Sequence, residues 1–135
     1  MSHSIENRYS GDLRTESTHL KSSRTIITDA PTDNNGKGNA FSPTDLVATS
    51  LASCMMTIMG IVAERNQIDI KGATAEVRKI MGENPRRISE IKIEFNFYKS
   101  ISLKDRKKIE KVAKSCPVSN SLSKKLIESL NFIYN

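Results

Sequence analysis

The sequence predicts an α+β fold in one domain that spans residues 1–135. The expected elements follow one another in the order β-β-α-β-β-α-α-β, and a chain without a regular βα repeat favours α+β over a doubly wound sheet. The length of 135 residues fits a single compact core. One long uncharged segment lies near the middle of the chain and indicates a central buried helix.

The N-terminal part indicates strands. Residues 7–16 and Arg24–Asp29 (RTIITD) have strand-like composition, and residues 21–23 (KSS) suit a turn. We therefore expect a hairpin or meander. Residues 30–43 follow as a loop, since Pro and Gly interrupt the backbone repeatedly.

The central helix has the clearest start signal. Ser42 suits the N-cap, Pro43 suits the first helical position, and Asp45 lies in the first turn. We expect the helix to run from Pro43 to about Arg65.

Residues 46–63 (LVATSLASCMMTIMGIVA) carry no charge and reach the lower limit of a transmembrane span. Small and polar residues interrupt this segment, and no aromatic belt flanks it. We therefore expect no membrane association. A helix that is apolar all round is instead expected to be covered on every side.

The C-terminal half predicts a hairpin, two helices and a final strand. Residues 73–81 and 88–98 form the hairpin around a turn at 82–87, with one buried face in the second strand: Ile91, Ile93, Phe95 and Phe97. Residues 103–114 predict an amphipathic helix whose apolar stripe comprises Leu103, Ile109, Val112 and Ala113. Cys116-Pro117 opens a second short helix over VSNSLSKKLIESL, and residues 131–134 form the last strand.

The charge of the chain suggests one alternative function. The chain has 21 basic and 15 acidic side chains and a net charge of +6. The basic residues include Lys104, Arg106, Lys107, Lys108, Lys111, Lys114, Lys124 and Lys125. A basic nucleic-acid-associated domain is therefore an alternative, but Asp105 and Glu110 interrupt the basic helix face and no nucleic-acid-binding motif accompanies it.

Two cysteines are too few for a disulfide scaffold, and the N-terminus has no apolar secretory segment, so we expect a cytoplasmic protein. Cys54, Cys116, His3 and His19 are scattered without the paired spacing of a structural zinc site, so we expect no metal.

The two cysteines differ in their predicted surroundings. Cys54 lies inside the uncharged helix, where it is either a small buried hydrophobe or a thiol activated by a cation. Cys116 precedes Pro117 at a helix start, which favours a thiolate and makes it the better acid on electrostatics alone. It is equally well explained as a packing residue. Sequence spacing does not establish whether the two thiols meet.

The segments FSPTDLVATSLASCMMTI and CPVSNSL resemble the osmotically inducible and organic-hydroperoxide-resistance (OsmC/Ohr) family of thiol peroxidases, in its broader OsmC-like branch. The resemblance spans nearly the whole chain. It implies an OsmC-like fold in an intertwined homodimer, with the central helices back to back and two active sites near the interface.

The resemblance also implies roles for the thiols. Cys54 would be the peroxidatic residue that turns an organic hydroperoxide into an alcohol and becomes a sulfenic acid, and Cys116 would be the resolving residue that forms a disulfide with it. An external dithiol reductant, a lipoyl group in some relatives, would regenerate the thiols, so no bound cofactor is expected.

The family pairs an N-terminal arginine with the peroxidatic cysteine. Arg14 is the closest placement here, with Arg8 and Arg24 as alternatives. The hydroperoxide-resistance branch holds this arginine with a glutamate after the helix-opening proline, where this chain has Thr44. Asp45, the next residue, is the candidate partner instead.

A substrate pocket would involve apolar residues near Cys54, namely Phe41, Leu51, Met55 and Met59. Such a pocket would favour alkyl or lipid-like hydroperoxides, although packing explains the same residues. The main alternative function is a non-catalytic OsmC-like protein that binds a small apolar ligand.

Overall fold

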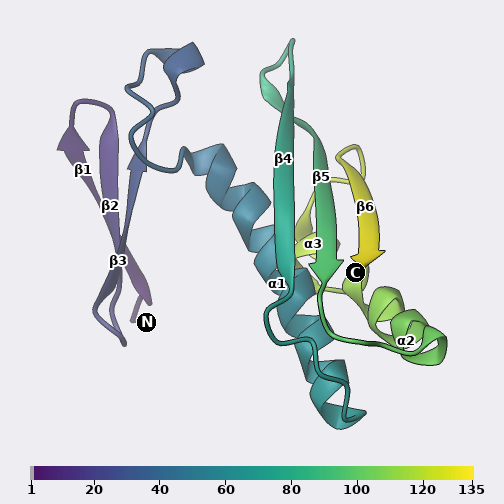
Figure 1. The fold of residues 1–135 in the computed structure, drawn as a ribbon. Helices are drawn as coiled ribbons and strands as arrows, with labels where there is room; N and C mark the ends of the chain where they lie inside the picture. The colour runs from purple at the N-terminus through teal and green to yellow at the C-terminus, as the bar shows by residue number, and fades with distance from the viewer. Residues whose placement is uncertain (1) are drawn as a thin grey trace. The chain divides into compact units, whose positions relative to one another are not determined.

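The structure is a computed structural model, and it describes residues 2–135. It has the α+β architecture that the sequence predicts (Figure 1). The chain divides into two compact units, Met1–Leu46 and Val47–Asn135, and each is described by itself. The assignment of residues 1–135 to one domain stays a prediction.

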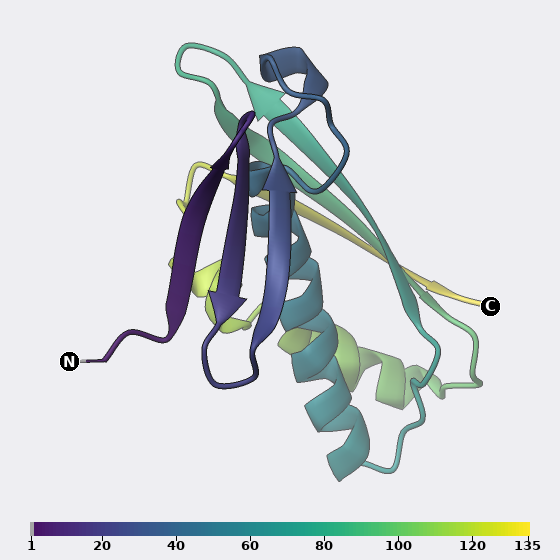
Figure 2. The same ribbon diagram turned by 90° about the vertical axis from the view of Figure 1, so that its left-hand side faces the viewer.

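The first unit contains a three-stranded antiparallel meander, β1 (Ile5–Gly11), β2 (Arg14–His19) and β3 (Arg24–Asp29), shown in Figure 2. The single strand predicted over residues 7–16 is wrong, because a turn divides it. Asp12 and Leu13 adopt positive φ angles of 54° and 62° in this turn. These are conformations that L-residues rarely adopt, so the sequence signal for the turn is weak.

The loop after β3 is irregular, as predicted, apart from the short 3₁₀ helix η1 (Thr32–Asn34). The close packing of Ala30 against Gly36 explains why this position of the loop requires glycine. A Cβ at Gly36 would lie 1.7 Å from the carbonyl oxygen of Ala30, so any other residue would displace the backbone.

Helix α1 (Pro43–Arg65) has the predicted bounds. The hydroxyl of Ser42 accepts a hydrogen bond from the backbone N–H of Asp45 at 3.0 Å, and the Asp45 carboxylate accepts one from the N–H of Ser42 at 3.0 Å. This reciprocal pair is a capping box, which satisfies two backbone donors at the helix start.

The single chain covers only part of α1, so the expectation that the helix is covered on every side, with a dimer partner completing the cover, stays a prediction. The buried residues of α1 are Ala48, Leu51, Ala52, Met55, Met59 and Ala63. A second stripe remains exposed at helical spacing and comprises Ser50, Ser53, Thr57 and Ile61. By length and composition alone α1 is also long enough to cross a membrane, a test that the core helix of a soluble protein passes too.

The second unit contains the sheet β4-β5-β6, formed by β4 (Thr74–Gly82), β5 (Arg87–Phe97) and β6 (Ile127–Tyr134). β4 and β5 are antiparallel, and β5 and β6 are parallel. Helices α1, α2 (Leu103–Ala113) and α3 (Pro117–Ser121) lie on one face of this sheet (Figure 1). The predicted buried face of β5 is confirmed, since its four apolar side chains are at most 1% exposed and pack in one core cluster with α1 and α2.

Two predictions for the C-terminal part are wrong. The second short helix ends at Ser121 instead of continuing to Leu130, and Ile127 already begins β6. Pairing with β5 overrides the helical pattern, because Phe132 stacks on Phe95 with ring centroids 5.2 Å apart. Leu103 is 73% exposed and does not belong to the apolar stripe of α2, of which Ile109 and Ala113 are buried.

Candidate active site

The two cysteines meet inside the second unit. Cys54 lies on α1 and is half-buried, whereas Cys116 is the N-cap residue of α3 and is fully buried. Cys54 packs against the core cluster to which Cys116 belongs, close enough for its side chain to act on the pKa of the Cys116 thiol, and both are free cysteines. The fold therefore brings together two thiols that the sequence leaves far apart.

Burial controls the chemistry of Cys116. Loss of solvent raises the pKa of the Cys116 thiol above its ordinary value of 9.0, and the neighbouring Cys54 side chain raises it further. The backbone N–H of Ser119 donates to Cys116 Sγ at 3.3 Å and acts in the opposite direction. The sequence argument that the helix start lowers the pKa of Cys116 is therefore wrong, because desolvation outweighs the hydrogen bond.

Ser119 and Glu128 adjoin this thiol pair, and the sequence analysis missed both. The hydroxyl of Ser119 donates to the Glu128 carboxylate, at 2.7 Å from Oε1 and 2.9 Å from Oε2. A sequence signal existed, because the alternation Glu128, Leu130, Phe132, Tyr134 places an acid on the face of β6 that is otherwise apolar.

Arg14 lies in the first unit and pairs with an acid that the sequence analysis did not consider. Its Nε lies 3.6 Å from Oδ1 of Asp29, which is opposite Arg14 in the β2–β3 register and fully buried. The backbone N–H of Asn39 donates to Asp29 Oδ2 at 2.9 Å. That hydrogen bond, followed by the charge of Arg14, holds the pKa of Asp29 below its ordinary value of 3.8.

The predicted partners of Arg14 therefore stay predictions. The Asp45 carboxylate accepts the capping hydrogen bond from Ser42. Arg14 belongs to the first unit and Cys54 to the second. The predicted pairing of the Arg14 guanidinium with the Cys54 thiol therefore stays a prediction.

The residues proposed for a substrate pocket differ in exposure. Leu51, Met55 and Met59 are 0% exposed and fill the core of the second unit, whereas Phe41 in the first unit is 53% exposed. Their role as a pocket stays a prediction. An open hollow of about 600 Å³ lies on the sheet of the second unit, among charged and polar side chains that include Glu76, Arg78, Glu90 and Lys92, and neither cysteine lines it.

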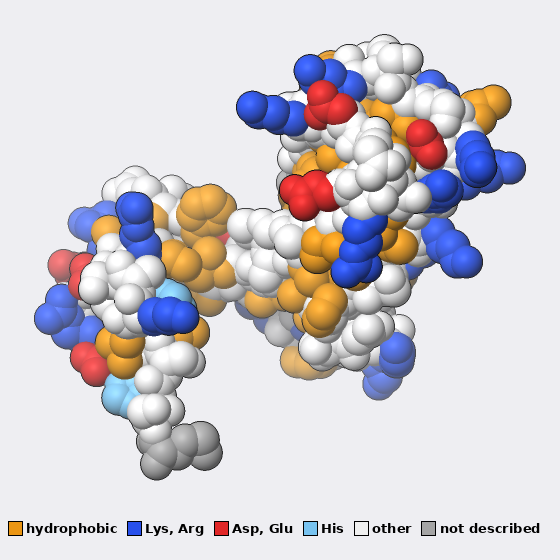
Figure 3. Space-filling view, turned by 90° about the horizontal axis from the view of Figure 1, so that it is seen from below, with side chains coloured by type: hydrophobic (Ala, Val, Ile, Leu, Met, Phe, Trp, Pro, Cys, Tyr) orange, Lys and Arg blue, Asp and Glu red, His pale blue; other side chains and the backbone are white. Residues whose placement is uncertain are grey.

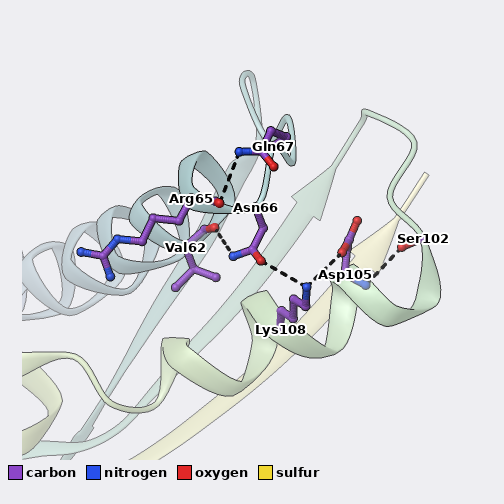
Figure 4. Close-up of polar contacts among 7 residues, drawn as sticks. All are labelled: Val62, Arg65, Asn66, Gln67, Ser102, Asp105 and Lys108. Atoms are coloured by element: carbon purple, nitrogen blue, oxygen red, sulfur yellow. Dashed lines mark hydrogen bonds and ion pairs between the residues drawn. The ribbon is translucent and has the colours of Figure 1, made fainter.

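Part of the predicted basic face is engaged within the chain. Lys108 Nζ donates to Asn66 Oδ1 at 3.1 Å, and Asn66 in turn donates to the carbonyl of Val62 at the end of α1 (Figure 4). The guanidinium of Arg106 lies 4.3 Å from the ring centroid of Tyr134. On the face drawn in Figure 3, Lys and Arg side chains are interspersed with acidic and uncharged ones and do not form one continuous patch.

Residues 2–135 contain no group of three or more His, Cys, Asp or Glu side chains that could hold a metal ion.

The profile of the OsmC-like protein family matches residues 36–129, which include both cysteines. The chain belongs to this family. It is 48% identical to a Psychrobacter arcticus protein whose crystal structure is described, provisionally, as an osmotic stress induced and detoxification response protein, with a TM-score of 0.92 and coverage of 100% of this chain and 97% of that one.

More distant OsmC-like structures share the fold. An OsmC-like protein from Mycoplasma pneumoniae is 20% identical, with a TM-score of 0.80 over 99% of this chain and 97% of that one. An organic hydroperoxide resistance protein from Elizabethkingia anophelis is 16% identical, with a TM-score of 0.76 over 100% of this chain and 99% of that one. A search of curated protein sequences finds no match.

Proposed function

We propose that this OsmC-like protein is a cysteine-based peroxidase that reduces organic hydroperoxides to alcohols. The proximity of Cys54 to Cys116 in one core cluster carries the proposal, because a two-cysteine peroxidase needs its thiols close enough to form a disulfide. The similarity to a fold that includes an organic hydroperoxide resistance protein supports the choice of substrate.

The unequal burial of the thiols supports their roles. Cys54 is the more accessible thiol, so its thiolate attacks the distal oxygen of the hydroperoxide, the O–O bond breaks, and the alcohol leaves after protonation. Cys54 then carries the sulfenic acid. Cys116 attacks the sulfur of this group, the S–O bond breaks, and water leaves with the proton of the Cys116 thiol.

These two steps consume one hydroperoxide and the two protein thiols, and they yield one alcohol, one water and one disulfide. An external dithiol, with a lipoyl group as one candidate, restores the thiols by disulfide exchange. The protein itself needs no bound cofactor for these steps. A reducing compartment such as the cytoplasm would supply the dithiol.

A homodimer is part of the proposal. The sheet β1-β2-β3 exposes large apolar side chains that include Ile5, Tyr9, Ile26 and Ile27, each more than 50% exposed. The stripe Ser50, Ser53, Thr57 and Ile61 leaves one side of α1 open. The exposed apolar side chains of β1-β2-β3 are typical of an interface, and a second copy of the chain would cover them together with the open side of α1.

The activity test follows thiol oxidation by two oxidants. Reduced wild-type protein, Cys54→Ser and Cys116→Ser are each mixed with cumene hydroperoxide and with hydrogen peroxide. We expect wild type to react faster with cumene hydroperoxide and to form an intramolecular disulfide, Cys54→Ser to lose the reaction, and Cys116→Ser to stop at the sulfenic acid.

If wild type consumes neither oxidant faster than a small free thiol does, the peroxidase proposal fails and a ligand-binding role gains support. If Cys116→Ser loses peroxide reactivity while Cys54→Ser keeps it, the two roles are inverted.

A further inference from the structure

Glu128 occupies a position where the fold calls for an apolar side chain. It lies opposite Ile91 in the parallel register of β5 and β6, and Ile91 is fully buried on the face of the sheet that the helices cover. Leu130, the next inward residue of β6, packs against the apolar core. Glu128 is the first of the inward-facing residues of β6. It needs a polar partner, because a half-buried carboxylate without hydrogen bonds is destabilising.

The partner of Glu128 comes from the turn that holds the thiol. Both carboxylate oxygens accept from the Ser119 hydroxyl, at 2.7 and 2.9 Å, and the backbone N–H of the same serine donates to Cys116 Sγ at 3.3 Å. Ser119 therefore connects β6 to the sulfur through two hydrogen bonds. Charge-assisted hydrogen bonds of this kind are stronger than neutral ones.

We propose that Glu128 and Ser119 are positioning residues for the resolving thiol, holding the first turn of α3 against β6 so that Cys116 Sγ is aligned with the sulfur of Cys54. This proposal deepens the proposed function and rests on it for the role of the disulfide in catalysis. A five-residue helix has few internal hydrogen bonds of its own, so a tie to the sheet fixes its orientation.

The aromatic disulfide dithiobis(nitrobenzoate) tests the alignment without any peroxide. The Cys54 thiolate attacks the reagent and forms a mixed disulfide, releasing one coloured thiolate. Cys116 then attacks the Cys54 sulfur of the mixed disulfide, forms the protein disulfide and releases the second thiolate. The reagent is reduced to two thiolates, and two protein thiols become one disulfide with the loss of two protons.

The two releases separate kinetically. The rate of the first release depends on the reagent concentration. The second release is first-order, and its rate reports the attack by Cys116. Cys116→Ser should retain the first phase and lose the second. Absorbance of the released thiolate follows both phases in one stopped-flow trace.

We expect Ser119→Ala and Glu128→Ala to slow the second phase on the order of tenfold while the first phase stays within about twofold of wild type, since misalignment of reacting atoms is costly. Glu128→Gln keeps an acceptor oxygen for the Ser119 hydroxyl and should restore most of the rate. Ser129→Ala is the matched control, because Ser129 also donates to a glutamate, Glu90, on the same sheet.

A second-phase rate for Ser119→Ala within about twofold of the Ser129→Ala rate would overturn the proposal. So would a Glu128→Ala rate within about twofold of that control, because the hydrogen bond from Ser119 to β6 would then have no effect on the attack by Cys116. If the second phase behaves as expected while cumene hydroperoxide is not reduced, the positioning role stands and the peroxidase proposal fails.

Discussion

The two units of the chain bury different kinds of side chain. In the described part of Met1–Leu46 the buried residues are Thr28, Asp29 and Ser42, which are all polar. In Val47–Asn135 the buried residues are apolar side chains and the thiol of Cys116. The second unit is therefore stabilised by its own core, whereas the first depends on hydrogen bonds and leaves its large apolar side chains exposed.

This difference indicates that the second unit contains its own apolar core and both thiols. The second unit brings both cysteines together within one apolar core, so the thiol pair needs no residue from elsewhere to meet. The first unit supplies Arg14, which is already paired with a buried acid. Substitutions in the two units should accordingly have effects of different size and origin.

The largest effect is expected in the apolar core. Phe95 is fully buried and stacks on Phe132, so Phe95→Ala should lower the free energy of unfolding by about 3–5 kcal/mol. Phe41→Ala, in the first unit, removes a ring that is 53% exposed and should cost under about 1 kcal/mol. Urea unfolding at one fixed protein concentration measures both. Equal losses would contradict the contrast between the units.

A smaller effect is expected at the start of α1. Ser42→Ala removes the hydroxyl that caps the N–H of Asp45, so stability should fall by about 1 kcal/mol. Ser50→Ala is the control, because Ser50 is an exposed serine on the same helix, and its substitution should change stability by less than about 0.5 kcal/mol. A Ser42→Ala variant as stable as Ser50→Ala would show that the capping box does not contribute to the free energy of unfolding.

The smallest effect depends on pH. The pKa of Asp29 is lowered in the folded protein, so its contribution to stability is present above its ordinary value of 3.8 and is lost as pH falls through the folded-state pKa. Asp29→Asn should therefore destabilise the protein at pH values above that value, and its difference from wild type should shrink in acid. Unfolding curves across the acid range measure this.

Asn39→Ala keeps the backbone N–H that donates to Asp29 and should retain the wild-type pH profile. If Asp29→Asn and wild type lose stability in parallel as the pH falls, the carboxylate of Asp29 is not the group responsible.

Local signals made several elements predictable from the sequence. Ser42, Pro43 and Asp45 mark the start of α1, because capping involves neighbours in the chain. The alternation in β5 identifies its buried face, because one side of the strand packs on helices. The family resemblance rested on the segments FSPTDLVATSLASCMMTI and CPVSNSL, which contain the start of α1 and the two cysteines.

Tertiary contacts explain what the sequence did not reveal. Residues 127–130 have a helical pattern but become a strand through pairing with β5, a contact distant in the chain. Cys116 has the local features of an acidic thiol, but its burial in the core raises its pKa instead. Asp29 and Glu128 acquire their importance only from partners that the fold supplies.

The most direct test of the central claim is the intact mass of the reduced protein after addition of one equivalent of cumene hydroperoxide. We expect wild type to lose two hydrogens, about 2 Da, through a Cys54–Cys116 disulfide, and Cys116→Ser to gain one oxygen, about 16 Da, at Cys54. An unchanged wild-type mass, or a disulfide that joins two chains through Cys54 instead, would contradict the account.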